Sequence, residues 1–279
     1  MLEIGKYNDL EVIKKVDFGL YLLADDLEIL LPLKYIARGT EVGDILNVFI
    51  YKDSEDRLIA TTLKPYAILD EFAYLQVKEV NQTGAFLDWG IAKDLLVPFR
   101  EQGKLMEQGK KYIVRIYLDA STNRIAASAL INKYIEKQHI NLQEGDVVEI
   151  LVANKTDMGY TAIINNKYMG LLFKNEIFHE IRVGDKMNAF IKRIREDNKI
   201  DLSLQRSGYE LIDASRNTIM KMLKENNGFL ALNDKSTSLE ISKKLNMSKK
   251  AYKKSIGSLY KERVIEIVDD GIKLINKLF

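Results

Sequence analysis

The hydrophobic pattern changes once along the chain, near residue 207. Before that point apolar and polar residues alternate with a period of two, as in half-buried β-strands, for example in residues 112–116. The same period places Val147, Glu149 and Leu151 on one face of another strand. After residue 207 the period is near 3.6, which is typical of amphipathic helices. The pattern predicts a long β-rich part followed by a short helical part.

The β-rich part repeats three times, and glycines mark the repeat. Gly19, Gly84 and Gly159 each follow a strand-like run and precede an aromatic residue within two positions. A second glycine follows 24 or 25 residues later in each repeat. Each repeat has room for about five short strands, and five antiparallel strands with a glycine at a strand bend predict a small barrel of the OB type.

The first and last strands of these repeats resemble a known domain. Leu75–Val80 and Thr83–Asp88 are similar to the opening of the S1-type RNA-binding domain, and Asn123–Ser128 resembles its last strand. Arg57–Thr61 and Lys199–Ser203 resemble the same last strand in the other two repeats. The resemblance implies that all three repeats are S1-type barrels.

The C-terminal part predicts the helix, strand, helix, helix, hairpin order of a winged helix. A long helix ends near Gly228, a second covers about 238–245, and Ser248 is a suitable N-cap for a third that runs to about Glu262. A hairpin turning at Asp269–Gly271 follows. The predicted fold is mostly β with an α-helical C-terminal domain: three five-stranded OB barrels at 1–66, 67–131 and 143–206, then a winged helix at 208–279.

This order of domains, in a chain of 279 residues, resembles the bacterial family called conserved virulence factor B. The resemblance covers the whole chain. It implies an RNA-binding regulator of gene expression rather than an enzyme.

Composition narrows the chemistry. Cysteine is absent, which excludes thiolate catalysis, disulfides and cysteine-containing metal sites. Apolar runs such as Ile29–Leu33 are far shorter than the roughly 20 residues of a membrane span, and no signal segment is evident, so we expect a cytoplasmic protein without a membrane partner. His139 and His179 lie in no catalytic or metal-binding motif, and we expect no enzymatic activity, cofactor or metal.

Charge is distributed unevenly, although the net charge is only +2. It is −3 over residues 1–143, zero over 144–206 and +5 over 207–279. On the third predicted helix, a rotation of 100° per residue separates a lysine face from a face with Tyr252 and Tyr260. Lysines without arginine or asparagine favour contact with phosphates over base reading. A solvated lysine face is the alternative interpretation.

Aromatic residues of the middle strands are candidates for stacking bases. Phe86 is predicted to lie on the opposite face of its strand from Ala85 and Leu87. Phe18 and Tyr21 occupy matching positions in the first repeat. A core position in a small barrel is the alternative for each ring.

The repeats also depart from the S1 pattern. In the third repeat the aromatic residue is Tyr160, one position early, which leaves Thr161 where the second repeat has Phe86. A histidine usual in the family is replaced in all three repeats, so we expect that some barrels have lost RNA contacts. The replacing residues are Pro32, Pro98 and Phe173.

Single-stranded RNA is the expected partner, held mainly by the third barrel and the winged helix. A DNA-binding transcriptional regulator acting through the winged helix and a protein-interaction scaffold are the alternatives. The candidate nucleic-acid-binding residues are Phe18, Tyr21, Phe86, Arg124, Lys192, Arg193, Arg195, Lys199, Lys249, Lys250, Lys253 and Lys254.

Overall fold

The computed structural model describes residues 2–177, 180–205 and 209–275, with residues 209–214 described by their backbone alone. His179 therefore lies outside the described residues. The chain divides into two compact units between Ile135 and Glu136. This division into two units does not test the limits predicted for the four domains, which stay a prediction.

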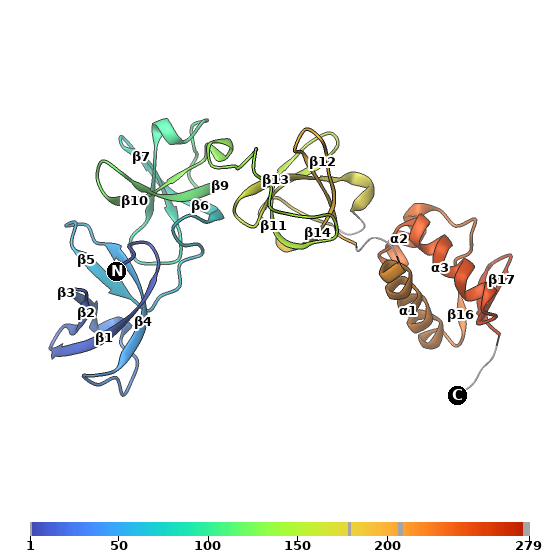
Figure 1. Cartoon of the computed structure of the whole chain (residues 1–279), viewed down its shortest axis with the longest axis horizontal. Coiled ribbons are helices and arrows are strands. Elements are labelled where there is room, and N and C mark those ends of the chain that lie inside the picture. The colour runs from blue at the N-terminus through green and yellow to red at the C-terminus, as the bar shows by residue number, and fades with distance from the viewer. Residues whose placement is uncertain (1, 178–179, 206–208, 276–279) are drawn as a thin grey trace. The chain divides into compact units, whose positions relative to one another are not determined.

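The first unit begins with a closed five-stranded barrel, in which β3 runs parallel to β5 and the other neighbours are antiparallel (Figure 1). Alternate side chains such as Val12, Leu20 and Leu22 fill its interior. Its strands pair in the order β1-β2-β3-β5-β4. The elements are β1 (Tyr7–Val16), β2 (Gly19–Ala24), β3 (Leu27–Pro32), the short 3-10 helix η1 (Leu33–Tyr35), β4 (Ile45–Lys52) and β5 (Leu58–Thr61).

The same chain order recurs in the second half of this unit. Here the strands form a five-stranded sheet in the order β10-β9-β6-β7-β8, whereas a closed barrel was predicted. The two edge strands of this sheet, β8 and β10, lie close together. The elements are β6 (Phe72–Asn81), β7 (Gly84–Asp88), β8 (Leu95–Pro98), η2 (Phe99–Glu101), β9 (Lys111–Asp119), β10 (Arg124–Ser128) and η3 (Ile131–Lys133). We call this part the second barrel.

The second unit begins with another closed barrel. Val148 and Ile150 fill its core, whereas Val147 and Glu149, which were predicted to share one face, are both exposed. Both alternating sets of positions contain apolar residues, and the period alone could not choose between them. The elements are β11 (Val147–Lys155), β12 (Gly159–Ile164), β13 (Tyr168–Phe173), η4 (Lys174–Glu176), β14 (Lys186–Ile194) and β15 (Ile200–Ser203).

The marker glycines are explained by a close approach between strands. Gly84 pairs with Pro98, and a Cβ atom at Gly84 would lie 2.3 Å from the carbonyl oxygen of Val97. Only glycine fits such a contact. A Cβ atom at Gly19 or Gly159 would meet the next strand in the same way.

The winged-helix order predicted for the C-terminal part is confirmed. Ser248 caps α3, since its hydroxyl accepts a hydrogen bond from the Ala251 amide at 3.0 Å. Tyr252 is buried, but Tyr260 is 55% exposed and was wrongly placed on the same face, because eight residues turn it about 80° away. The elements are α1 (Tyr209–Glu225), β16 (Phe229–Leu230), α2 (Ser238–Leu245), α3 (Lys249–Lys261), β17 (Ile265–Val268) and β18 (Gly271–Leu274).

Candidate nucleic-acid interface

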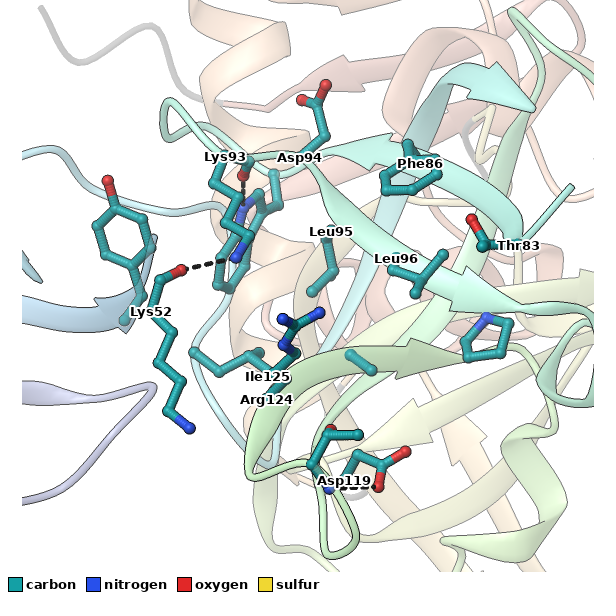
Figure 2. Close-up of a pocket in the computed structure, with 15 residues that line it drawn as sticks. Lys52, Thr83, Phe86, Lys93, Asp94, Leu95, Leu96, Asp119, Arg124 and Ile125 are labelled. Carbon is teal, nitrogen blue, oxygen red and sulfur yellow. Dashed lines mark hydrogen bonds between the residues drawn. The ribbon is translucent and has the colours of Figure 1, made fainter. Parts of the chain in front are cut away.

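A cleft of about 300 Å³ lies beside β7, β8 and β10 of the second barrel (Figure 2). Phe86 and Leu96 pair across β7 and β8 and form its apolar wall. Ala85 and Leu87 are completely buried, whereas Phe86 is only partly buried, so the strand turns this ring out of the core as predicted.

Three cations lie around the same cleft. Arg124 is on β10, Lys93 precedes β8, and Lys52 ends β4 of the first barrel (Figure 2). The Lys93 ammonium donates to the backbone carbonyl oxygens of Lys52 at 2.9 Å and Asp53 at 2.6 Å. Burial lowers the pKa of Lys93. The cleft thus combines an apolar wall with a rim that carries these three cations and the carboxylates of Asp94 and Asp119.

Arg124 is engaged with a carboxylate of the first barrel. Its Nε donates to Asp56 Oδ1 at 2.6 Å, and its Nη2 donates to Asp56 Oδ2. The hydrogen bond from Arg124 holds the pKa of Asp56 below its usual value. A phosphate group at Arg124 would have to compete with Asp56 or share the guanidinium with it.

A shared core fixes the wall of the cleft. Trp89 is buried and meets the edge of Phe49 from the first barrel, with ring centroids 5.6 Å apart. The indole N–H of Trp89 donates to the backbone carbonyl of Lys93. These contacts hold Lys93 and the segment before β8 against the first barrel.

The strand registers show which aromatic residues correspond in the three barrels. Tyr21 pairs with Lys14, Phe86 with Glu79 and Thr161 with Asn154, next to a register shift at the same place in each barrel. Phe86 therefore corresponds to Tyr21 and not to Phe18, and the third barrel has Thr161 there, as predicted. The register offers an aromatic residue in the first two barrels only.

Both candidate aromatic residues of the first barrel lie at its surface. Phe18 is 58% exposed, and its ring meets Tyr21 edge to face with centroids 6.4 Å apart. The Lys14 ammonium lies 5.8 Å from the centroid of Tyr21. Such a ring could stack on a base while the neighbouring cation holds a phosphate.

The basic cluster of the third barrel is largely paired with acids. Lys192 forms an ion pair with Glu176, and Lys199 one with Asp197 at 2.7 Å. The hydrogen bond from Lys199 lowers the pKa of Asp197. Three of the four predicted cations have a carboxylate partner; the third is Arg195, which donates to both oxygens of Asp201 at 2.7 and 3.0 Å.

The lysines of α3 are in a different situation. Lys250, Lys253 and Lys254 are exposed, and Lys249 is partly buried at the start of the helix. No carboxylate among the described side chains forms an ion pair with any of the four. They leave a basic helix face open to a ligand.

Sequence reasoning missed two cations near the aromatic residues. Lys93 lies in the segment between β7 and β8, where neither the strand period nor the helix period applies. Only the packing of Trp89 reveals that Lys93 lies at the cleft. Lys14 comes opposite Tyr21 because the register shifts between Val12 and Lys14. Such a shift leaves no clear signal in one sequence.

Two family models match the chain, one at each end. Residues 4–63 match the S1 domain and residues 217–274 the CvfB-like winged helix domain. Together with the OB-type strand order, these matches define a protein that joins an S1 domain and further OB-type strand units to a winged helix. Within the described ranges, none of the helices has both the length and the apolar character to span a membrane.

Two relatives that match most of the chain carry the same name. Conserved virulence factor B of Staphylococcus epidermidis (strain ATCC 12228) is 25% identical over 244 residues, which are 85% of this chain and 82% of that protein. The protein of the same name from Staphylococcus aureus N315 is also 25% identical over 244 residues, covering 85% and 81%. The predicted resemblance to the conserved virulence factor B family is confirmed.

A solved structure is similar over nearly the full length. It is a multidomain protein with nucleic acid binding domains from Streptococcus pneumoniae TIGR4, 25% identical, with 98% of both chains covered and a TM-score of 0.44.

Proposed function

We propose that this chain is a non-enzymatic regulator of gene expression that binds single-stranded RNA in the cytoplasm. The observation that carries the proposal is the cleft that Phe86 lines together with Arg124 and Lys93. OB-type barrels hold single strands by stacking bases on aromatic rings while cations follow the phosphates. The cleft offers both kinds of contact.

Two further observations support the proposal. The S1 match of the first barrel and the relatives named conserved virulence factor B favour RNA and regulation. The exposed lysines of α3 offer a second contact with the RNA backbone, independent of the barrels. The two contacts together would let one strand engage more than one domain.

The test replaces the ring in the cleft. In the full chain, Phe86→Ala should weaken binding of homopolymeric RNA about 5- to 150-fold, since a stacked base is worth roughly 1 to 3 kcal/mol. The thermal unfolding temperature should change little because the ring is only partly buried. Filter binding and calorimetry measure the two effects. Phe99→Ala is the matched control, because Phe99 is a 43% exposed phenylalanine on η2 that does not line the cleft.

Four outcomes would contradict the proposal. Unchanged binding by Phe86→Ala would remove the cleft from the interface, and a stability loss of roughly 3 kcal/mol or more would make Phe86 a core residue. Tighter binding of single-stranded DNA than of RNA would favour a DNA-binding regulator. Absence of binding to either would leave the protein-interaction scaffold.

A further inference from the structure

Helix α3 contains a glycine, Gly257, that the fold itself does not require. Gly257 lies inside the helix and is not among the residues with positive φ. Apart from its chain neighbours and the nearby backbone of its own helix, a Cβ atom built there would meet no atom within 4 Å. At Gly271, by contrast, a Cβ atom would lie 2.3 Å from the carbonyl oxygen of Leu230. Neither backbone conformation nor packing within the described residues explains Gly257.

This glycine weakens the helix that carries it. In a helix interior glycine is less favourable than alanine by about 1 kcal/mol, because it loses more backbone freedom on folding. Nothing in the folded chain offsets that cost at Gly257. A benefit outside the chain, in a complex, would account for it.

Gly257 lies within the lysine face of α3. At 100° per residue, four lysines point within about 60° of Gly257. They are Lys250, Lys253, Lys254 and Lys261. Lys254 is about 4.5 Å before Gly257 along the helix axis, and Lys261 is about 6 Å beyond it. All four lysines are exposed, and no described carboxylate forms an ion pair with them. The absent side chain thus leaves a gap between cations.

We propose that a nucleic-acid backbone crosses α3 at Gly257. Lysines on both sides hold its phosphates, and the missing side chain lets the phosphodiester chain approach the helix backbone. The occupant follows from charge, since the face is basic and its lysines have no described acidic partner. Lysines alone hold a backbone without reading bases. The inference rests on the proposed function and extends it to one position of the winged helix.

Two ways in which α3 could bind a nucleic acid predict different results for a substitution at Gly257. One is a general electrostatic attraction to the lysine face, and the other is a close contact of the nucleic-acid backbone with the helix. A neutral side chain at Gly257 leaves the charge of the face unchanged, so an electrostatic face would bind as before. A close contact would be blocked. The two effects of a larger residue therefore have opposite signs, because the helix gains stability while the complex loses it.

The experiment uses Gly257→Ala and Gly257→Leu in the full chain. Both should raise the unfolding temperature of the winged helix by several degrees. Gly257→Leu should weaken binding of a homopolymeric RNA at least about fivefold at 0.1 M salt, the effect of one lost phosphate contact, and Gly257→Ala should weaken it less. Asn217→Ala is the matched control: it also improves the helix propensity of an exposed position, on α1, and should not change binding.

Equal losses for RNA and for DNA of the same length support contact with the shared phosphodiester chain. A loss confined to RNA would overturn that assignment and point to the ribose hydroxyl. Gly257→Leu binding as tightly as the parent, or losing stability together with affinity, would also overturn the inference. If Lys250, Lys253 and Lys254 prove dispensable, the winged helix leaves the proposed interface altogether. If they are required and Gly257→Leu is silent, only the crossing at Gly257 is refuted.

Discussion

The third barrel and helix α3 carry equal numbers of predicted contact cations in opposite surroundings. In the barrel, the partners of Lys192, Arg195 and Lys199 are Glu176, Asp201 and Asp197. On α3, no described carboxylate forms an ion pair with the four lysines. The two regions have the same number of predicted contact cations, but they differ in how many of those cations are free of a described carboxylate partner.

The difference limits what a charge count along a sequence can say about binding. A surface ion pair contributes little to stability, commonly less than about 1 kcal/mol. It nevertheless keeps a carboxylate beside the cation, and that carboxylate repels an approaching phosphate. The prediction of one basic surface over the third barrel and the winged helix therefore receives support mainly from its helical half.

The largest effect should come from removing the available charge. Lys250→Gln, Lys253→Gln and Lys254→Gln together should lower RNA affinity about 100-fold at 0.1 M salt, since binding to a single strand varies with salt to the power of about 0.7 per phosphate contact. The slope of log affinity against log salt should fall by about 2. Filter binding over a salt series measures both. A change of less than threefold would assign the lysine face to solvent.

The fold was predictable from the sequence wherever a local signal was strong. Ser248 before α3 and the turn at Asp269–Gly271 marked the winged helix correctly. The alternation around Phe86 placed that ring outside the core. The buried face of the strand that begins at Val147 could not be chosen from the period alone, because apolar residues occupy both of its faces.

The partners of the cations could not be predicted in the same way. Lys192 and Glu176 are 16 residues apart and lie on β14 and after β13. Arg195 reaches Asp201 across the hairpin of β14 and β15, in which Asp201 pairs with Arg193. Such contacts depend on side-chain placement across strands, which composition and period do not contain.

Removing a carboxylate in the third barrel should have the opposite effect. Asp197→Asn leaves Lys199 without its ion-pair partner, and RNA affinity should rise about fivefold at 0.1 M salt if Lys199 then contacts one phosphate. Filter binding measures the change. Asp234→Asn is the matched control, because Asp234 is an exposed aspartate of the winged helix in none of the described ion pairs. An equal gain in the control would mean that net charge alone controls affinity.

The smallest effect should come from deleting an ion pair as a whole. Lys199→Gln combined with Asp197→Asn keeps the net charge and removes a pair whose side chains are 71% and 52% exposed. Stability should change by less than about 1 kcal/mol, as for other exposed pairs. RNA affinity should stay within about twofold of the parent, because the paired Lys199 contributes no full phosphate contact. Calorimetry and filter binding provide the two measurements. A fivefold loss of RNA affinity would show that Lys199 contacts RNA despite its ion pair with Asp197. The paired cations of the third barrel would then contribute to binding as much as the lysines of α3, which have no described carboxylate partner.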